Sequence, residues 1–202
     1  HKGEHYQCKG CTFDQSMILE TYRDLLHAAS ILKIKDPFLK TIEKEIPRLN
    51  PIEIGESGQI KEFREEKKYG DIGEVHHRHI SHLCALYPGT MITSATPEWM
   101  KAAAVSLTMR GDKSTGWAMA HRQVSWARLK NGEKAYQLYK GILSERVMQN
   151  LWAFHPPFQI DANLGATAGV AEMLLQSHEG YIEPLPALPK AWKNGSYEGL
   201  MA

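Results

Sequence analysis

Residues 155–165 (HPPFQIDANLG) combine reactive side chains with a stiff backbone. Pro156 and Pro157 fix φ and remove two amide donors, so the sequence predicts a non-helical turn that stops just before a helix. Asp161, held on such a turn beside the amide of Asn163, could activate water as a general base. A structural interpretation competes with this one, because Asp and Asn are also favoured N-caps of helices.

A second polar cluster occupies residues 77–82 (HRHISH). Arg78 offers a planar fork of donors and His79 can donate or accept, so both could bind a polyhydroxylated substrate or steady a negative charge. Three histidines without helical spacing are a weak metal-ligand set, and the alternative is a partly buried loop whose histidines bond to backbone. Trp126 is predicted to lie in the core, whereas Trp117 begins a helix, where an exposed ring could stack on a sugar.

The bulk composition argues against several classes of function. A formal net charge of +1 on 202 residues gives no field that would attract nucleic acid or an anionic membrane surface. No run approaches the ~20 apolar residues that span a bilayer. Cys8 and Cys11 form a lone Cys-x-x-Cys pair without the second pair of ligands that a structural zinc site needs, so we expect no metal.

Apolar residues recur at helical spacing through most of the chain. The pattern predicts helices over residues 14–34, 38–46, 97–110, 116–129, 133–143, 145–152 and 165–178, and an extended tail over residues 181–188. Little strand signal is left, so the predicted fold class is all-α. Periodicity alone leaves open a helical bundle, a helical solenoid and part of an α/α toroid.

Long, ordered motifs run along nearly the whole chain. They are CTFDQSMILETYRDLL (11–26), HRHISHLCALYPG (77–89), GDKSTGWAMAHRQVSWARLKNGEKAY (111–136), NLWAFHPPFQIDANLG (150–165) and AGVAEMLLQSHEGYIEPLPALPKAWKNGSYEGL (168–200). Together they resemble glycoside hydrolase family 95, the inverting α-L-fucosidases that act chiefly on α-1,2-linked fucose. The resemblance implies an (α/α)6 barrel, of which residues 1–202 form a single partial domain, the C-terminal portion of the catalytic domain. Residues 181–202 would then start an exit segment that leads toward a following β domain.

The resemblance also assigns roles to residues of the predicted site. It implies that Asp161 is the base-side carboxylate, that Arg78 and His79 contact the sugar, and that Trp117 forms part of the site wall. Asn163, beside the acid, is predicted to bind substrate as well. The family has Gly where Ala162 stands and Phe where Leu164 stands, which leaves L-fucose and L-galactose both open as the sugar.

The general acid of the family is a Glu in a Ser-Pro-Glu motif, which does not occur in these 202 residues. We therefore expect the chain alone to be nearly inactive, and its partners to be a fucosylated glycan and the N-terminal part of its own catalytic domain. The chemistry needs only carboxylates and water, so no cofactor is expected. The family suggests a secreted or periplasmic protein, although no signal peptide is visible. The alternative function is a non-catalytic helical carbohydrate-binding module.

Overall fold

The computed structural model describes residues 9–66, 75–155 and 157–200, so Cys8 and Pro156 lie outside the described residues. The described part is mainly helical, as the periodicity predicts. Its α-helices are α1 (Thr12–Ile31), α2 (Phe38–Glu45), α4 (Pro97–Arg110), α5 (Gly116–Arg128), α6 (Gly132–Glu145) and α7 (Asp161–Leu174). Two short 3-10 helices, Ile46–Arg48 and Ser81–Leu83, complete the helical elements.

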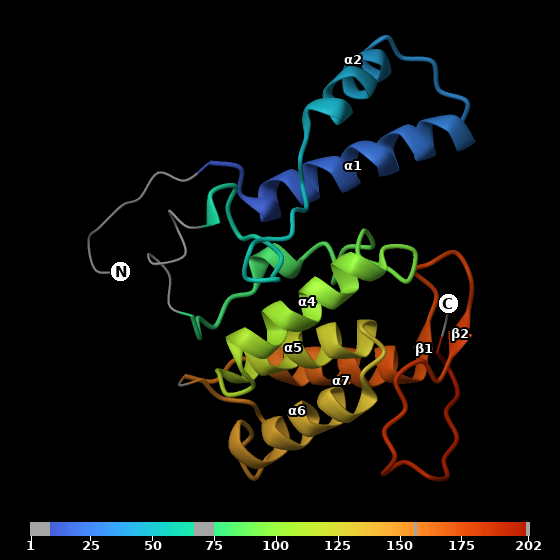
Figure 1. Ribbon diagram of the computed structural model, residues 1–202. Helices are drawn as coiled ribbons and strands as arrows, with labels where there is room; N and C mark the ends of the chain where they lie inside the picture. Colours follow the sequence, from blue (N-terminus) through green and yellow to red (C-terminus); the bar gives the residue numbers. More distant parts are fainter. Residues whose placement is uncertain (1–8, 67–74, 156, 201–202) are drawn as a thin grey trace.

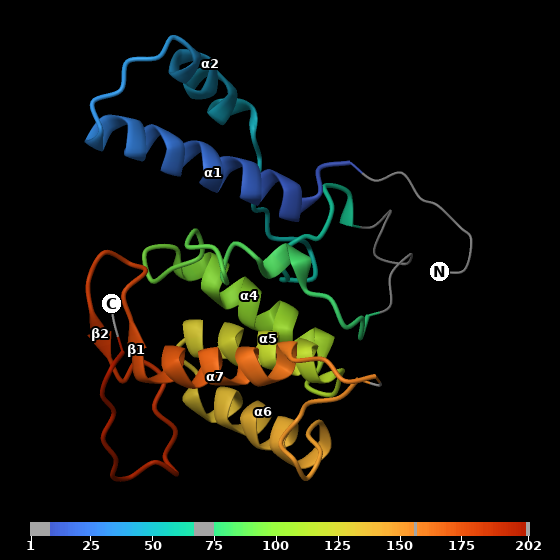
Figure 2. The same ribbon diagram turned by 180° about the vertical axis from the view of Figure 1, so that it is seen from behind.

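Helices α1 and α2 form an arm that projects from the rest of the molecule, where α4, α5, α6 and α7 lie together (Figures 1 and 2). The base of α1 is tied to this main body by backbone and side-chain hydrogen bonds. The Thr12 amide donates to the Glu62 carbonyl at 3.1 Å, and the Thr90 amide donates to the Glu20 carboxylate at 2.7 Å. The far end of α1 leaves Ile31 66% exposed.

The start and end signals of the helices explain most of the observed boundaries. Pro97 opens α4 after the N-cap residue Thr96, and Gly111 ends it with φ 80°, a conformation that glycine adopts without steric cost. The Asn131 side chain caps α6 by accepting a hydrogen bond from the Lys134 amide at 3.1 Å. Both helices are confirmed close to their predicted bounds.

One predicted helix is absent, and both predicted ends of another are wrong. The helix predicted over residues 145–152 is not formed, because Val147 pairs with Ala153 in an antiparallel bridge and the chain turns between them. The last helix begins at Asp161 and not near Gly165, and it ends at Leu174 because the next residue adopts an extended conformation.

A small β-hairpin follows the last helix. Strand β1 (Leu175–Gln176) pairs antiparallel with β2 (Glu183–Pro184), and this is the one sheet among the described residues. The hairpin lies beside the C-terminal end of α7 (Figures 1 and 2). The extended character predicted for residues 181–188 is therefore found in part, whereas a following β domain stays a prediction.

The core of the main body is apolar and tightly closed. Trp126 is 5% exposed, which confirms its predicted core position. Other side chains exposed by 1% or less include Leu83, Leu86, Ile92, Leu107, Leu138, Ile142 and Met173. In the described part of the chain, no helix is long and apolar enough to cross a membrane.

Candidate functional site

Helices α5 and α7 lie against each other along a seam of very small residues. A β-carbon added at Gly116 would lie 3.0 Å from the Ala162 β-carbon, and one added at Gly165 would lie 2.9 Å from the Ala120 β-carbon. These contacts follow the same order along both helices, so α5 and α7 run parallel and their N-termini meet at one end of the molecule. The small side chains at the seam set how closely these N-termini approach.

Asp161 is the first residue of α7, and its side chain is exposed. The N-cap position belongs to Ile160, and no side chain caps this helix, so Asp161 is not the helix cap that the structural interpretation suggested. A carboxylate in the first helical turn is stabilised by the positive end of the helix dipole. The sequence placed Asp161 on the turn before the helix, whereas the structure fixes its backbone within the helix itself.

The loop that carries Arg78 and His79 reaches the same end of the molecule. The His79 ring lies 4.9 Å from the Trp117 ring between centroids, and it stacks on His77 at 5.0 Å. Trp117 follows Gly116 in sequence, and Gly116 contacts the residue after Asp161 across the seam. The structure therefore brings the His79 loop, the start of α5 and the start of α7 together, as the site prediction requires.

Arg122 holds this loop in place, and the sequence reading did not single it out. Its side chain is 1% exposed, and its guanidinium donates to the carbonyls of Gly111 at 2.8 Å and His77 at 3.0 Å. Burial lowers the pKa of Arg122 to about 10, so the side chain stays protonated at neutral pH. An arginine within an otherwise buried helix was the available signal, since a buried charge must have partners.

The protonation of His79 suits recognition of hydroxyl groups. Partial burial lowers the pKa of His79, and the neighbouring charges of His77 and Arg78 lower it further. The neutral imidazole therefore predominates at neutral pH, with one ring nitrogen as donor and the other as acceptor. Arg78 is exposed at this end and is free to donate from its planar fork.

Asn163 has a structural task that the sequence did not reveal. Its amide oxygen accepts from the Ala153 amide at 2.9 Å, and its amide nitrogen donates to the Leu151 carbonyl at 2.7 Å. The side chain thus fastens the turn before α7 onto the first turn of that helix. Its second lone pair and second N–H are left, so the predicted direct contact with substrate stays a prediction.

The sequence departures from the family pattern fall in two different environments. Ala162 is 2% exposed and packs in the α5–α7 seam, whereas Leu164 is 65% exposed. His121, on α5, lies with Nε2 3.1 Å from the Tyr87 carbonyl, and burial lowers its pKa. Among the described residues no group of three or more potential metal ligands comes together.

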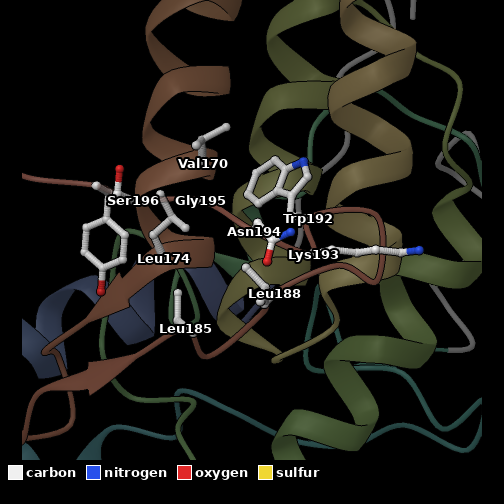
Figure 3. Close-up of a pocket in the computed structure, with 10 residues that line it drawn as sticks. Val170, Leu174, Leu185, Leu188, Trp192, Lys193, Asn194, Gly195 and Ser196 are labelled. Carbon is white, nitrogen blue, oxygen red and sulfur yellow. The ribbon is translucent and has the colours of Figure 1, made fainter.

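A pocket of about 780 Å³ lies elsewhere, beside the C-terminal half of α7 (Figure 3). Val170 and Leu174 face Leu188 and Trp192 across it. The remaining lining residues are Leu185 and residues 193–197, and none of the lining residues carries a carboxylate. Because glycoside hydrolysis needs carboxyl groups, this pocket cannot be the hydrolytic centre on its own.

Comparison with known families agrees with the motifs. Residues 1–174 match the glycosyl hydrolase family 95 catalytic domain, and residues 176–202 match the glycoside hydrolase family 95 C-terminal domain. The chain therefore belongs to glycoside hydrolase family 95.

The chain is also similar to three proteins that are named as fucosidases. It is 40% identical to "Alpha-L-fucosidase 2" of Arabidopsis thaliana over 95% of its own length and 24% of that protein. It is 33% identical to "Probable alpha-fucosidase A" of Aspergillus oryzae, and 31% identical to the Aspergillus niger protein of the same name. These alignments cover 30% and 27% of the two fungal proteins, so the chain spans less than a third of each relative.

Proposed function

We propose that this chain supplies the base side of the active site of an α-L-fucosidase that hydrolyses terminal α-1,2-linked fucosyl residues with inversion. The observation that carries the proposal is the meeting of the two parallel helix N-termini. It holds Asp161 at the start of α7 close to Trp117 at the start of α5 and to the His79 loop. A carboxylate, a neutral imidazole and an exposed guanidinium are thereby supplied by neighbouring segments at one end of the molecule.

Asp161 acts in this proposal as the general base. Inverting hydrolysis uses two carboxyl groups roughly 6.5–9.5 Å apart, so that a water molecule fits between the base and the sugar. Asp161 takes a proton from this water as the water attacks the anomeric carbon, and the glycosidic bond breaks as the opposite carboxyl group protonates the leaving oxygen. That general acid comes from a part of the protein outside these 202 residues, since the chain spans less than a third of each relative.

The remaining site residues bind the sugar. Arg78 and His79 donate to and accept from its hydroxyl groups, and the Trp117 ring, packed against His79, forms a wall of the site. The helix arrangement supports membership of an (α/α)6 barrel, because α5 and α7 run parallel and in contact, while α6, joined to α5 by a short turn, lies beside them (Figure 1). In such a barrel α5 and α7 would be inner helices whose N-termini open at the active-site mouth.

Release of fucose from 2′-fucosyllactose tests this function. The comparison uses this chain, a chain extended upstream to the length of its relatives, and the Asp161→Asn form of the extended chain. We expect only the extended wild-type chain to be active, and we expect Asp161→Asn to lower kcat by about 10² to 10⁴-fold, the usual contribution of a general base. Proton NMR of the first product anomer should show β-L-fucose, because the reaction inverts the configuration.

An extended chain that binds 2′-fucosyllactose but never releases fucose would overturn the catalytic proposal and favour a carbohydrate-binding module. An Asp161→Asn form with full activity would leave the fucosidase function standing and remove Asp161 from the base role.

A further inference from the structure

The turn before α7 presents an aromatic pair to solvent. The Trp152 and Phe158 rings lie 4.7 Å apart between centroids with an interplanar angle of 32°, yet they are 54% and 42% exposed. Phe158 precedes Asp161 by three residues, so the pair adjoins the start of α7. Large aromatic side chains that stay exposed beside a polar site are typical of surfaces that bind a ligand.

The backbone that carries Trp152 is held from several sides. The Met148 amide donates to the Trp152 carbonyl at 2.9 Å, and the Trp152 amide donates to Asn150 Oδ1 at 3.1 Å. The two hydrogen bonds of Asn163 described above fasten the residues on either side of Trp152. This turn therefore presents the indole ring from a fixed backbone, which lowers the entropy lost when a ligand binds.

The same turn contains a strained residue. Leu151 has φ 66°, in the left-handed region that side chains with a β-carbon rarely adopt, and it is 68% exposed. Nothing buried is gained by this conformation, because the Leu151 side chain points to solvent. Strain that the surrounding hydrogen bonds maintain is common at ligand-binding sites, where it fixes the direction of a neighbouring side chain.

We infer that Trp152 and Phe158 form a stacking platform for the pyranose ring that is linked to the scissile fucosyl residue. The inference rests on the proposed fucosidase function and adds a leaving-group subsite to it. A pyranose presents a flat face of C–H groups, and an aromatic ring covers such a face without needing hydrogen bonds. The half-exposed position of the pair suits a sugar at the rim, because a scissile sugar must be surrounded by its catalytic groups. Asn163 is then a positioning residue that acts through Trp152.

Two substrates that differ only in the leaving group test the platform. The chain extended upstream to the length of its relatives is assayed on 2′-fucosyllactose, which has a leaving sugar, and on α-L-fucosyl fluoride, which has none. For Trp152→Ala we expect the ratio of kcat/KM for the trisaccharide to kcat/KM for the fluoride to fall about tenfold, mainly through KM, as the loss of one aromatic contact would give. Trp152→Phe should restore most of the ratio, and Asn163→Ala should lower it less than Trp152→Ala.

Tyr197→Ala is the matched control, because Tyr197 is an exposed aromatic residue away from the turn, 41% exposed, and its loss should leave the ratio unchanged. A ratio that Trp152→Ala leaves at the wild-type value, or equal losses on both substrates, would overturn the platform while leaving the fucosidase function intact. A wild-type enzyme inert on both substrates would overturn the fucosidase function itself, and the platform with it.

Discussion

Both ends of the α5–α7 pair are rich in charged side chains, but the two ends use them differently. At the C-terminal end the charges are paired and largely buried. Arg128 forms a two-point ion pair with Glu172, with N–O distances of 2.6 and 3.0 Å, and Lys130 pairs with both Glu179 and Glu183. This end joins the β-hairpin to the helices and leaves no charge of these five groups without an opposite partner.

The N-terminal end leaves two of its charged side chains open. Arg78 and Asp161 are exposed and make no ion pair with the described part of the chain. The paired end stabilises the fold, and in the proposed function the open end keeps hydrogen-bonding groups available to a substrate. One helix pair can serve both purposes because its two ends lie a full helix length apart, about 20 Å for the 14 residues of α7.

The Glu179 carboxylate, at the paired end, is surrounded by hydrogen-bond donors and a positive charge. Burial by itself raises the pKa of Glu179, but hydrogen bonds from the Ser94 hydroxyl and amide and the charge of Lys130 outweigh this and lower it. Tyr181 adds a further hydrogen bond at 3.2 Å. The carboxylate is therefore fixed in its charged form by protein groups, whereas the carboxylate of Asp161 is exposed to solvent.

The largest expected effect on stability is that of replacing an arginine by methionine at the paired end. The same replacement at the open end serves as the comparison. Arg128→Met leaves Glu172 as a partly buried carboxylate without its partner and removes the buried cation over the Tyr87 ring, so we expect it to lower the free energy of unfolding by about 3 kcal/mol. Arg78→Met removes an exposed side chain and should change this free energy by less than about 0.5 kcal/mol. Urea unfolding of both variants measures the difference.

The double variant Arg128→Met with Glu172→Leu is the control, because it removes both buried charges and should recover much of the lost stability. Equal losses of stability for Arg78→Met and Arg128→Met would show that the two ends do not differ in the way proposed.

The pH dependence of stability should follow chiefly the buried histidines. Burial, with the Arg110 and His121 charges, lowers the pKa of His82 to about 3, and burial also lowers those of His121 and His178. In the unfolded chain a histidine titrates near 6.5, so below that pH the unfolded state binds a proton that the native state does not. Stability is therefore complete above pH 6.5 and falls as the pH drops, by about 2 kcal/mol between pH 7 and pH 5 for His82 alone.

Unfolding by urea at several pH values, for wild type and for His82→Met, isolates this histidine. Between pH 6.5 and pH 4, the unfolding free energy of the variant should fall less steeply with decreasing pH than that of wild type, by up to about 1.4 kcal/mol per pH unit. This difference in slope does not depend on the stability of the variant at pH 7. Identical slopes in the two proteins would mean that His82 is protonated in the native state as well.

Most of the helical framework could be predicted because its signals are local. Thr96, Pro97 and Gly111 mark the two ends of α4. The segment 145–152 was assigned wrongly because its conformation depends on distant partners, chiefly the Asn163 amide that accepts from the turn. A hydrogen bond between residues ten positions apart cannot be predicted from a local sequence pattern. This hydrogen bond outweighs the helix propensity of the segment.

The residues of the candidate site could be predicted from the sequence, but the residues that position them could not. Asp161, His79 and Trp117 stood out as reactive or aromatic residues, and their convergence depends on glycine and alanine at the α5–α7 seam, which composition does not single out. Arg122 was overlooked because a sequence does not say which carbonyl groups a buried guanidinium will reach. The assigned roles of Asp161, Arg78, His79, Trp117 and Asn163 stay predictions until activity is measured.

A modest expected effect on stability, at the packed helix starts, would sharpen the comparison at the open end. A β-carbon at Gly116 would lie 3.0 Å from the Ala162 β-carbon and 3.4 Å from the Arg146 β-carbon, so Gly116→Ala must move the starts of α5 and α7 apart by a few tenths of an ångström. We expect a loss of about 1 kcal/mol or less in unfolding free energy, since helix propensity partly offsets the strain. Fucose release by the extended chain should fall about tenfold, because small displacements of catalytic groups are costly. Gly195→Ala, with no atom within 4 Å of the new β-carbon, should change neither quantity. If Gly116→Ala kept full activity at reduced stability, the seam would serve the fold alone, and the open end would owe its geometry to another contact.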